Sequence, residues 1–482
     1  MLSVLPVLGQ LLAIFGATYV LPLAASLVFR DGTFDEFAIA AAVTSGVGGL
    51  IWLLTRKHGR ELKSRDGFLL VTLAWVSMSA AATIPLMLVI PDLSLTDAFF
   101  EAVSGLTTTG STVLTQIGSL PPSVNIWRHA LHWYGGMGII VLALAILPLL
   151  GVGGMQLYKA ETPGPIKDAK LTPRITETAK ALWLTYTGLT FACLVSLKLL
   201  GLSWFDAICH AFSVMALGGF SNYDSSVGEL QSPVVEVVLI AFMLIAAVNF
   251  ARHFVAFRRL TLSPYRNDPE LKALYLVLAA SVLLVAFTID AEGHYPSFWS
   301  ALRHSAFTVV SIATTTGFVT EDYEKWHSFV PWYLLLLSCF CASTGSTGGG
   351  IKMFRTLLLW RQAFREMRLM VHPQAVEPIR IGGQVVPNRI AYAVLAFISL
   401  YFMTVALLTF ALLLSDLDPV TSFSAVLASI NNMGPGLNRV GPSTTYQSLT
   451  DFQTWVCTAA MILGRLEIFS VLVLLTPAFW KK

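Results

Sequence analysis

Long apolar runs separated by short polar segments extend along the whole chain. A helix needs about 20 apolar residues to cross the hydrocarbon core of a membrane. On that criterion the pattern predicts ten transmembrane helices, near residues 4–28, 37–55, 67–90, 127–150, 178–200, 233–256, 273–290, 330–357, 388–415 and 452–478. Because no polar linker long enough to separate folding units lies between them, we expect one all-α polytopic membrane domain.

Lysine and arginine gather in alternate loops of this arrangement. The basic groups are Arg56, Lys57, Arg60, Lys63 and Arg65; Lys159, Lys167, Lys170, Arg174 and Lys180; Arg252, Arg258, Arg259 and Arg266; Arg355, Arg361, Arg365 and Arg368; and Lys481 and Lys482. The loops between them carry much of the acid, for example Asp97, Asp224 and Glu321. By the positive-inside rule the basic loops face the cytoplasm, and the N- and C-termini are expected on the same side.

Four of the acidic loops contain a semi-apolar stretch of about a dozen residues, too short to span and therefore predicted to be re-entrant. The stretches align without gaps: DAFFEAVSGLTTTG ends at Gly110, DAICHAFSVMALGG at Gly219, HSAFTVVSIATTTG at Gly317 and TSFSAVLASINNMG at Gly434. Their first residues, Asp97, Asp206, His304 and Thr421, each stand 13 positions before the glycine (110 − 97, 219 − 206, 317 − 304, 434 − 421), and the Asp and Thr residues are expected to cap short helices. A turn rich in Thr and Gly explains any single copy, but four copies in one register favour a repeated unit.

A unit of this kind is expected to attract a cation. A short helix that stops halfway through the membrane leaves its last carbonyl groups unsatisfied and its negative dipole end near the membrane centre. The extended segment that follows is tolerated there only where it lines a water-filled pore. The pattern therefore predicts four pseudo-symmetric units of helix, re-entrant pore loop and helix around one pore.

Composition agrees with a lipid-embedded chain and excludes several functions. Of the 482 residues 55% are hydrophobic and only 12% are charged, with a mean hydropathy of +0.70. The net charge of +3 is too small to indicate nucleic-acid binding. The five cysteines show no metal-type spacing, His129 and His132 lack a third ligand, and no catalytic serine or cysteine motif occurs. We therefore expect neither a metal centre of that kind nor an enzyme.

Five motifs together resemble the Trk/Ktr/HKT superfamily of potassium transporters, and most closely its TrkH-type bacterial members. They are TTTGST (107–112), ALGGFSN (216–222), TTTGFVT (314–320), NNMGPGLN (431–438) and STGSTGGGIK (343–352). The resemblance covers nearly the whole chain and implies potassium uptake across the bacterial cytoplasmic (inner) membrane. It also implies pore repeats at 67–150, 178–258, 273–368 and 388–482, with residues 1–60 forming two additional helices outside the pore.

Carried over by position, the resemblance assigns each repeat one strand of a selectivity filter, where backbone carbonyls would hold K⁺. The residues are Thr108, Thr109, Gly110 and Ser111; Leu217, Gly218, Gly219 and Phe220; Thr315, Thr316, Gly317 and Phe318; and Asn432, Met433, Gly434 and Pro435. Leu217 has no hydroxyl and Pro435 has no N–H, so fewer equivalent rings of oxygen are expected than in a potassium channel. Within the superfamily a serine at the first filter glycine accompanies sodium transport, so Gly110 favours potassium.

The eighth predicted helix is interrupted by CASTGSTGGGIK, whose glycines and hydroxyl residues do not sustain a lipid-facing helix. The resemblance makes this segment an intramembrane gate below the filter. The gate residues are Ala342, Ser343, Thr344, Gly345, Ser346, Thr347, Gly348, Gly349, Gly350 and Lys352. Close helix packing through small residues is the alternative interpretation.

Arg465 lies near the middle of the last predicted helix, where a charge costs at least about 2.5 kcal/mol. One interpretation pairs it with Glu467 or with backbone carbonyls for purely structural reasons. The other directs it into the pore beneath the filter, against the gate. Asn249, Arg252 and His253 at the end of the sixth predicted helix are interpreted as interfacial.

The resemblance also implies partners. It predicts a homodimer with one pore per protomer and a cytosolic TrkA-type nucleotide-binding ring that regulates the gate. ATP, ADP or NAD would bind that ring, so we expect no cofactor on this chain.

A carrier-type transporter with a substrate site at broken helices is a competing function, but inverted repeats would be expected for it, whereas these units are parallel. An intramembrane enzyme is a third, and would need a nucleophile or metal dyad. Channel-like flow and symport with protons or sodium are both compatible with the pattern.

Overall fold

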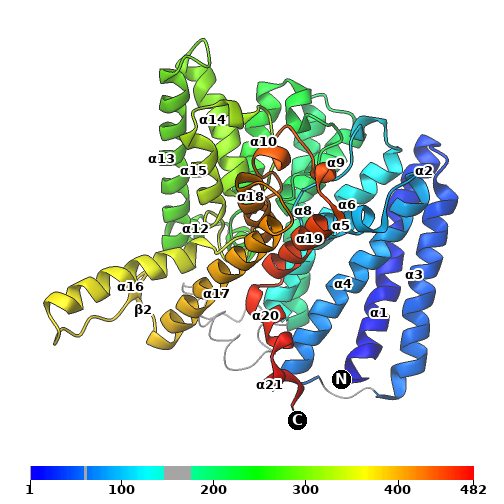
Figure 1. The fold of residues 1–482 in the computed structure, drawn as a ribbon, viewed down its shortest axis with the longest axis horizontal. Helices are drawn as coiled ribbons and strands as arrows, with labels where there is room; N and C mark the ends of the chain where they lie inside the picture. The colour runs from blue at the N-terminus through cyan, green and yellow to red at the C-terminus, as the bar shows by residue number, and fades with distance from the viewer. Residues whose placement is uncertain (1, 59–61, 146–174, 482) are drawn as a thin grey trace.

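The structure is a computed structural model of the whole chain, and it describes all residues except 1, 59–61, 146–174 and 482 (Figure 1). Within the described residues six helical segments are long and apolar enough to cross a membrane, or eight when two bent pairs are counted as single spans. The unbroken ones are α1 (Leu5–Gly16) continued by α2 (Val20–Phe29), α3 (Phe34–Thr55), α4 (Ser64–Val89), α8 (Ile175–Leu199), α13 (Pro269–Ala291) and α17 (Asn388–Leu413). The chain is thus an all-α polytopic membrane protein, as the apolar pattern predicts.

The order long helix, short helix, second helix occurs four times. The short helices are α5 (Leu95–Leu106), α9 (Trp204–Ala216), α14 (Phe298–Ala313) and α18 (Pro419–Ile430). They follow α4, α8, α13 and α17, and they precede α6 (Pro122–Ala145), α10 (Pro233–Ala246), α15 (Phe329–Ser338) and α19 (Asp451–Arg465). Each short helix packs against both helices of its own unit. These four helix triplets are called repeats one to four below.

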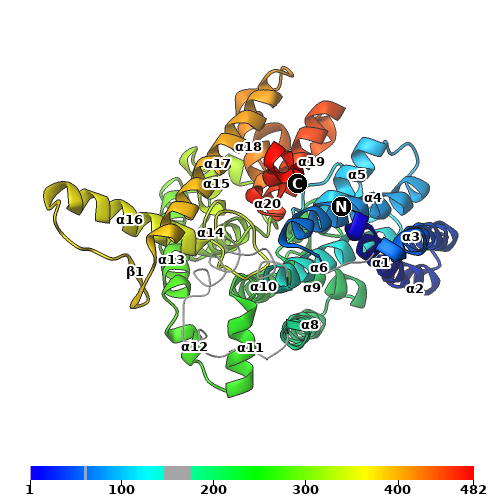
Figure 2. The same ribbon diagram turned by 90° about the horizontal axis from the view of Figure 1, so that it is seen from below.

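The repeats close into a ring. The second helix of each repeat packs against the short helix of the next one, α6 on α9, α10 on α14 and α15 on α18, and α19 returns to α5 of repeat one. In Figure 2 the colours accordingly pass around the molecule, from cyan on the right through green below to orange and red above. Helices α1, α2 and α3 lie at the edge and pack mainly on α4 and α6, and Phe29 of α2 also contacts Phe205 of α9.

In repeats one, two and four the short helices are capped three residues earlier than predicted, and in repeat three, for which no cap was predicted, the cap is Ser297. Ser94, Ser203 and Ser297 accept hydrogen bonds from the main-chain N–H groups three residues on, at 3.0, 3.0 and 3.3 Å, and Asp418 accepts from Thr421 N at 2.9 Å. The prediction that Asp97, Asp206 and Thr421 are the caps is therefore wrong, because a small hydroxyl or Asp outside the first turn satisfies these donors better. Burial by itself raises the pKa of Asp418, but hydrogen bonds from Thr421 and Asn438 and the charge of Arg439 outweigh it and lower that pKa below its usual value.

Two helices that the apolar pattern predicts as continuous are sharply bent. Helix α11 (Phe250–Arg259) turns by 95° from α10, because Asn249 accepts a hydrogen bond from Ala251 N and starts a new helix. The segment after α19, which contains α20 (Ile468–Leu472), turns by 109°, and Glu467 at that break has φ +62°. The predicted interruption of the eighth helix is confirmed, since α15 ends at Ser338 and α16 (Met353–Val371) begins only after the glycine-rich segment.

Helix α16 projects from the body, drawn in yellow in Figure 1. A two-stranded hairpin, β1 (Arg380–Ile381) with β2 (Gln384–Val385), follows it and leads back to α17. Among the described residues, the remaining short α-helices are α12 (Ser263–Arg266) and α21 (Pro477–Trp480).

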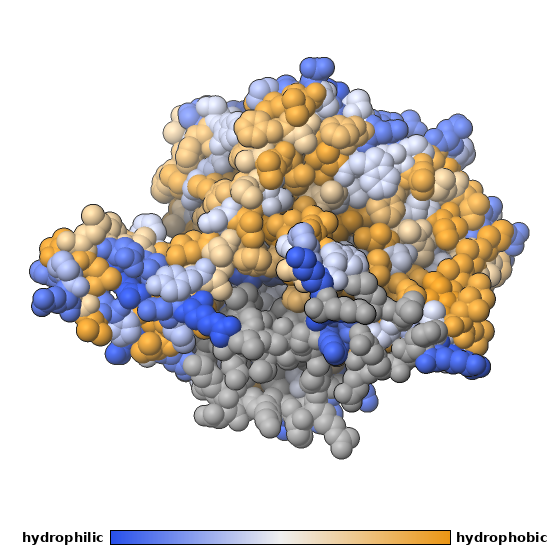
Figure 3. Space-filling model, turned by 60° about the horizontal axis from the view of Figure 1, so that its bottom comes forward, coloured by the Kyte–Doolittle hydropathy of each residue, from blue (hydrophilic) through white to orange (hydrophobic). Residues whose placement is uncertain are grey.

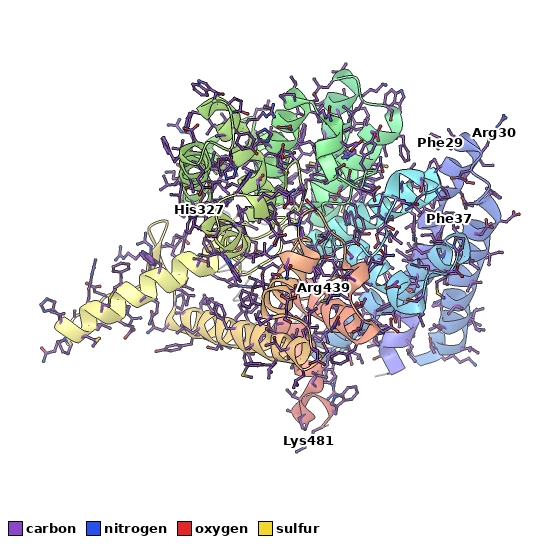
Figure 4. All side chains as sticks on the ribbon, turned by 45° about the horizontal axis from the view of Figure 1, so that its top comes forward. Phe29, Arg30, Phe37, His327, Arg439 and Lys481 are labelled. Atoms are coloured by element: carbon purple, nitrogen blue, oxygen red, sulfur yellow. The ribbon has the colours of Figure 1, made fainter. Side chains whose placement is uncertain are left out.

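Apolar side chains cover the sides of the body in Figure 3, as expected for a surface that faces lipid. On α3, for example, Val43, Val47, Leu50 and Leu54 are all exposed. Arg30 and Lys481, labelled in Figure 4, mark opposite sides of the molecule, beyond the ends of these apolar segments.

Candidate functional site

The four glycine segments share one backbone conformation although their sequences differ. Gly110, Gly219, Gly317 and Gly434 have φ of +82°, +84°, +81° and +100°. The residues two positions earlier, Thr108, Leu217, Thr315 and Asn432, also have positive φ, of +54°, +53°, +61° and +52°. A left-handed conformation is costly for a non-glycine residue. Its appearance at the same register in all four repeats shows that the fold imposes it, independently of local residue preference.

The four segments meet in a closed ring, called the glycine ring below. A Cβ atom added to Gly110 would lie 2.0 Å from Gly218 O, one added to Gly219 would lie 2.2 Å from Thr316 O, and one added to Gly317 would lie 2.0 Å from Met433 O. A Cβ on Gly434 would lie 2.9 Å from Thr109 O, which returns the circuit to repeat one. Each glycine therefore lies against the carbonyl that precedes the next repeat's glycine. Glycine is needed because this backbone approach leaves no room for a side chain.

Oxygen atoms and helix ends give this ring the chemistry of a cation site. The short helices end three or four residues before their glycines, so the negative ends of four helix dipoles converge there. In repeats one and three the hydroxyl pairs Thr107–Thr109 and Thr314–Thr316 lie 2.7 Å apart. Asn432 joins the last repeat to the first by donating from Nδ2 to Thr109 Oγ1 at 2.9 Å. Buried carbonyl and hydroxyl oxygens are ligands for a dehydrated alkali cation.

An open cavity of about 340 Å³ lies on one side of the glycine ring. Its lining includes all four ring glycines together with Ser111, Phe220 and Pro435. Ser111 Oγ donates to Gly434 O at 3.0 Å, and Phe318 O accepts from Ser311 Oγ at 2.7 Å. The cavity gives water a path to the ring from this side.

A buried ion pair contacts the segments of the glycine ring that belong to repeats one and two. Arg128 Nε donates to Glu101 Oε1 at 2.8 Å, and the two side chains are 1% and 0% exposed. Glu101 also accepts hydrogen bonds from Thr112 Oγ1 and Val113 N, which lie just after the Gly110 segment. Arg128 Nη1 reaches Ser221 O at 3.4 Å, and its guanidinium lies 4.2 Å from the ring centre of Phe220. One pair of charges thus ties the segments of repeats one and two together.

Neutralising only one member of this pair should destabilise the protein more than neutralising both. Glu101→Gln or Arg128→Gln leaves an uncompensated buried charge, which costs about 3 to 5 kcal/mol. The double variant removes both charges, so we expect it to recover part of that loss. Thermal unfolding of the detergent-solubilised protein measures the difference. A double variant as unstable as the sum of the two single variants would contradict a direct interaction between the two charges.

The glycine-rich loop (342–350) lies against the opposite side of the glycine ring. Gly349 N donates to Thr315 Oγ1 at 2.8 Å, and a Cβ on Gly349 would lie 1.8 Å from Asn431 O. A Cβ on Gly348 would lie 3.1 Å from Thr314 O and 3.4 Å from the side chain of Leu217. Lys352 Nζ donates to Gly348 O, and Thr347 Oγ1 donates to Met215 O at 3.1 Å. The loop therefore contacts the helix ends of repeats two, three and four.

Arg465 joins the glycine-rich loop to repeat one. Its Nη1 donates to Thr347 O of the glycine-rich loop at 2.8 Å and its Nη2 to Gly135 O of repeat one at 3.3 Å. The side chain is 4% exposed and lies at the last residue of α19, where the chain bends. The Glu467 alternative is wrong, since Glu467 accepts from Arg355 Nη2 at 2.7 Å. Backbone carbonyls are the partners of Arg465, and one of them belongs to the loop.

Several residues at this site were missed from the sequence. Asn249, Arg252 and His253 are buried in the protein, at 5%, 5% and 4% exposure, which the sequence did not indicate. A Cβ on Gly345 would lie 2.7 Å from Asn249 Nδ2, which brings Asn249 against the loop. The Glu101–Arg128 pair gave no signal in the sequence beyond two charges in apolar surroundings.

Comparison with known proteins agrees with this architecture. The sequence profile of the TrkH family, described as a cation transport protein, matches residues 34–482. The Trk system potassium uptake protein TrkH of Halomonas elongata is 46% identical over 480 residues, which cover 99% of either chain. The TrkH protein of Escherichia coli K12 is 43% identical, over 99% of this chain and 98% of its own.

A solved structure shows the same fold. The crystal structure of the potassium transporter TrkH from Vibrio parahaemolyticus superposes with a TM-score of 0.92 at 41% sequence identity, covering 100% of this chain and 99% of that one. These relatives are named as transporters, in agreement with the expectation that this chain is not an enzyme. The chain belongs to the TrkH family of cation transport proteins.

Proposed function

We propose that this chain takes up potassium ions across the cytoplasmic membrane through a pore at the centre of its four repeats. The glycine ring carries the proposal, because four backbone segments meet in a closed circuit, each glycine against a carbonyl of the next segment, and four helix dipoles point their negative ends at them. The names of the relatives, all Trk system potassium uptake proteins, support potassium as the ion.

The selectivity filter in this proposal consists of residues 108–111, 217–220, 315–318 and 432–435. The pore-forming units are 67–150, 178–258, 273–368 and 388–482, and the two helices within residues 1–60 lie outside the pore. The single register of positive φ values at all four repeats supports a common role for the four strands. The closed circuit, in which each glycine meets the same carbonyl position of the next repeat, also argues against the inverted repeats expected of a carrier.

The glycine-rich loop, with Lys352 and Arg465, is the proposed gate. Its contacts with Thr315, with Asn431 and, through Thr347, with Arg465 would hold it across the path on the side of the ring opposite the open cavity. Close backbone approach at Gly348 and Gly349 lets the loop pack against the helix ends. Its displacement would open a path for the ion.

The remaining assignments complete the proposal. We expect a homodimer in the bacterial inner membrane, with both termini in the cytoplasm and a TrkA-type ring bound on the cytoplasmic side. That ring would bind ATP, ADP or NAD and control the gate, and this chain would carry no cofactor besides the K⁺ that it transports.

Uptake of radiolabelled rubidium into proteoliposomes tests this function. The purified chain should take up rubidium, with potassium as a strong competitor and sodium as a weak one, because rubidium and potassium dehydrate at similar cost. Deleting Ser346–Gly348 should raise uptake, since the loop could no longer reach the ring. Absence of any monovalent-cation uptake in both proteins would overturn the pore proposal.

A further inference from the structure

The glycine-rich loop has a narrow neck where its two limbs lie side by side. Met353 N donates to Ala342 O at 2.8 Å, and Ile351 N donates to Cys339 O at 2.6 Å. Residues close together at this neck are therefore about ten positions apart in sequence. Loops of this length whose ends lie close together are compact.

A carboxylate from another element binds both limbs of this neck. Glu270 Oε1 accepts a hydrogen bond from Thr344 N at 2.7 Å and one from Phe354 N at 3.2 Å. The Glu270 side chain comes from the first turn of α13 and is 1% exposed. Hydrogen bonds from main-chain N–H groups to a carboxylate are stronger than those between neutral groups, and more so when buried.

In the part of the chain that the structure describes, helix α16 has no side-chain cap from its own N-cap residue. Its N-cap residue is Lys352, which has φ +76° and makes no side-chain cap hydrogen bond. Phe354 N is one of the donors that this helix end leaves open, and Glu270 satisfies it from outside. Glu270 thus fixes the point where the loop ends and the projecting helix begins.

The same turn is connected to the bent helix α11. Asp268, the N-cap of α13, accepts from Glu270 N at 3.0 Å and forms a buried ion pair with Arg252 of α11. The start of α11 in turn contacts the loop, because Phe250 N donates to Gly345 O at 3.1 Å and Ser343 N donates to Ala247 O at 3.1 Å. Residues 247–270 therefore hold the loop from two directions.

We propose that Glu270 is a positioning residue that keeps the glycine-rich loop closed and couples its closure to the position of α11. A displacement of α11 would move Arg252, and through Asp268 the first turn of α13, away from the neck. Both hydrogen bonds to Glu270 would then lengthen together and release both limbs of the loop at once. The inference rests on the proposed gating role of the loop.

Three variants in proteoliposomes test this inference. Glu270→Ala removes the acceptor from both limbs and should raise rubidium uptake by at least about tenfold, because the loss of even one charge-assisted hydrogen bond from the closed state has that effect. Glu270→Gln keeps an oxygen that can accept from Thr344 and Phe354, so it should stay within about threefold of the wild type. Glu292→Ala is the matched control, because Glu292 is an exposed carboxylate at the other end of α13, and its uptake should not change.

Hydrogen exchange provides a second readout. In Glu270→Ala the amides of Thr344 and Phe354 should exchange faster, while those of the short helix α18 should not. A residue that merely stabilises the fold would speed exchange throughout the body and would not be rescued by glutamine. If Glu270→Ala does not fold, Glu270→Asp carries the test, because a carboxylate shorter by one methylene should reach only one limb and give an intermediate uptake.

The loop deletion separates failure of this inference from failure of the gate. Raised uptake in the deletion but unchanged uptake and exchange in Glu270→Ala would overturn the role of Glu270 and leave the gate in place. Unchanged uptake in both variants, with both proteins folded, would overturn the gate and the inference together.

Discussion

Replacement of Gly110 by serine is expected to reduce the preference for potassium over sodium by at least about tenfold. The new Cβ would lie 2.0 Å from Gly218 O, so the carbonyl of repeat two has to move away from the ring. Serine at φ +82° also costs roughly 1 to 2 kcal/mol of backbone strain, which is about tenfold in an equilibrium. Rubidium uptake with potassium or sodium as competitor measures the preference.

Two further glycine variants sharpen this test. Gly434→Ser places its Cβ 2.9 Å from Thr109 O, so its effect should be smaller than that of Gly110→Ser. Gly188→Ser is the matched control, because nothing lies within 4 Å of its Cβ position on α8. Equal loss of preference in all three variants, or none in Gly110→Ser, would contradict the assignment of the glycine ring as the filter.

Replacement of Arg465 by alanine is expected to have the second large effect, a rise in ion flux. A hydrogen bond from a charged group contributes about 1.5 to 3 kcal/mol, and Arg465 donates one to Thr347 O of the loop and one to Gly135 O. Loss of the bond to the loop alone shifts the balance from closed to open by roughly tenfold to a hundredfold. The loss also removes a positive charge from beneath the ring, which lowers the electrostatic barrier for a cation.

Lysine at this position separates the effect of the lost hydrogen bond from the effect of the lost charge. Arg465→Lys keeps the charge but replaces the planar fork by a single ammonium group, which cannot readily reach both carbonyls. We expect its flux to lie between those of the wild type and of Arg465→Ala. Arg30→Gln, at an exposed site on the opposite side from Lys481, serves as the control (Figure 4). A flux in Arg465→Ala no higher than that of the control would contradict a role of Arg465 in closure.

The repeat units could be predicted from sequence because their signal is local. Each short helix and its glycine lie within one stretch of the sequence. Gly110, Gly219, Gly317 and Gly434, which align without gaps in the sequence, share one backbone conformation in the structure. The family membership is confirmed as well. The roles of the filter and gate residues stay predictions that the proposed uptake measurements test.

The supporting contacts could not be predicted, because they join residues far apart in sequence. Glu270 binds Thr344 N across 74 positions, and Arg128 binds Ser221 O across 93. The bend before α11 was missed for a different reason. Residues 245–248 are apolar, so hydropathy alone predicts a straight helix, whereas the cap at Asn249 and the contact of Phe250 N with the loop favour a break.

The closure of the glycine ring has a consequence for biosynthesis. Repeat four meets repeat one through Ser111 with Gly434 and through Asn432 with Thr109, each pair 323 positions apart. At about 5 to 20 residues per second, a ribosome needs roughly 15 to 65 seconds to make that length of chain. The first segment therefore stays in the membrane without its last neighbour for that time. Glu101, Thr112 and Arg128 all belong to repeat one. Their contacts can therefore form early and stabilise the first segment until the other three segments are present.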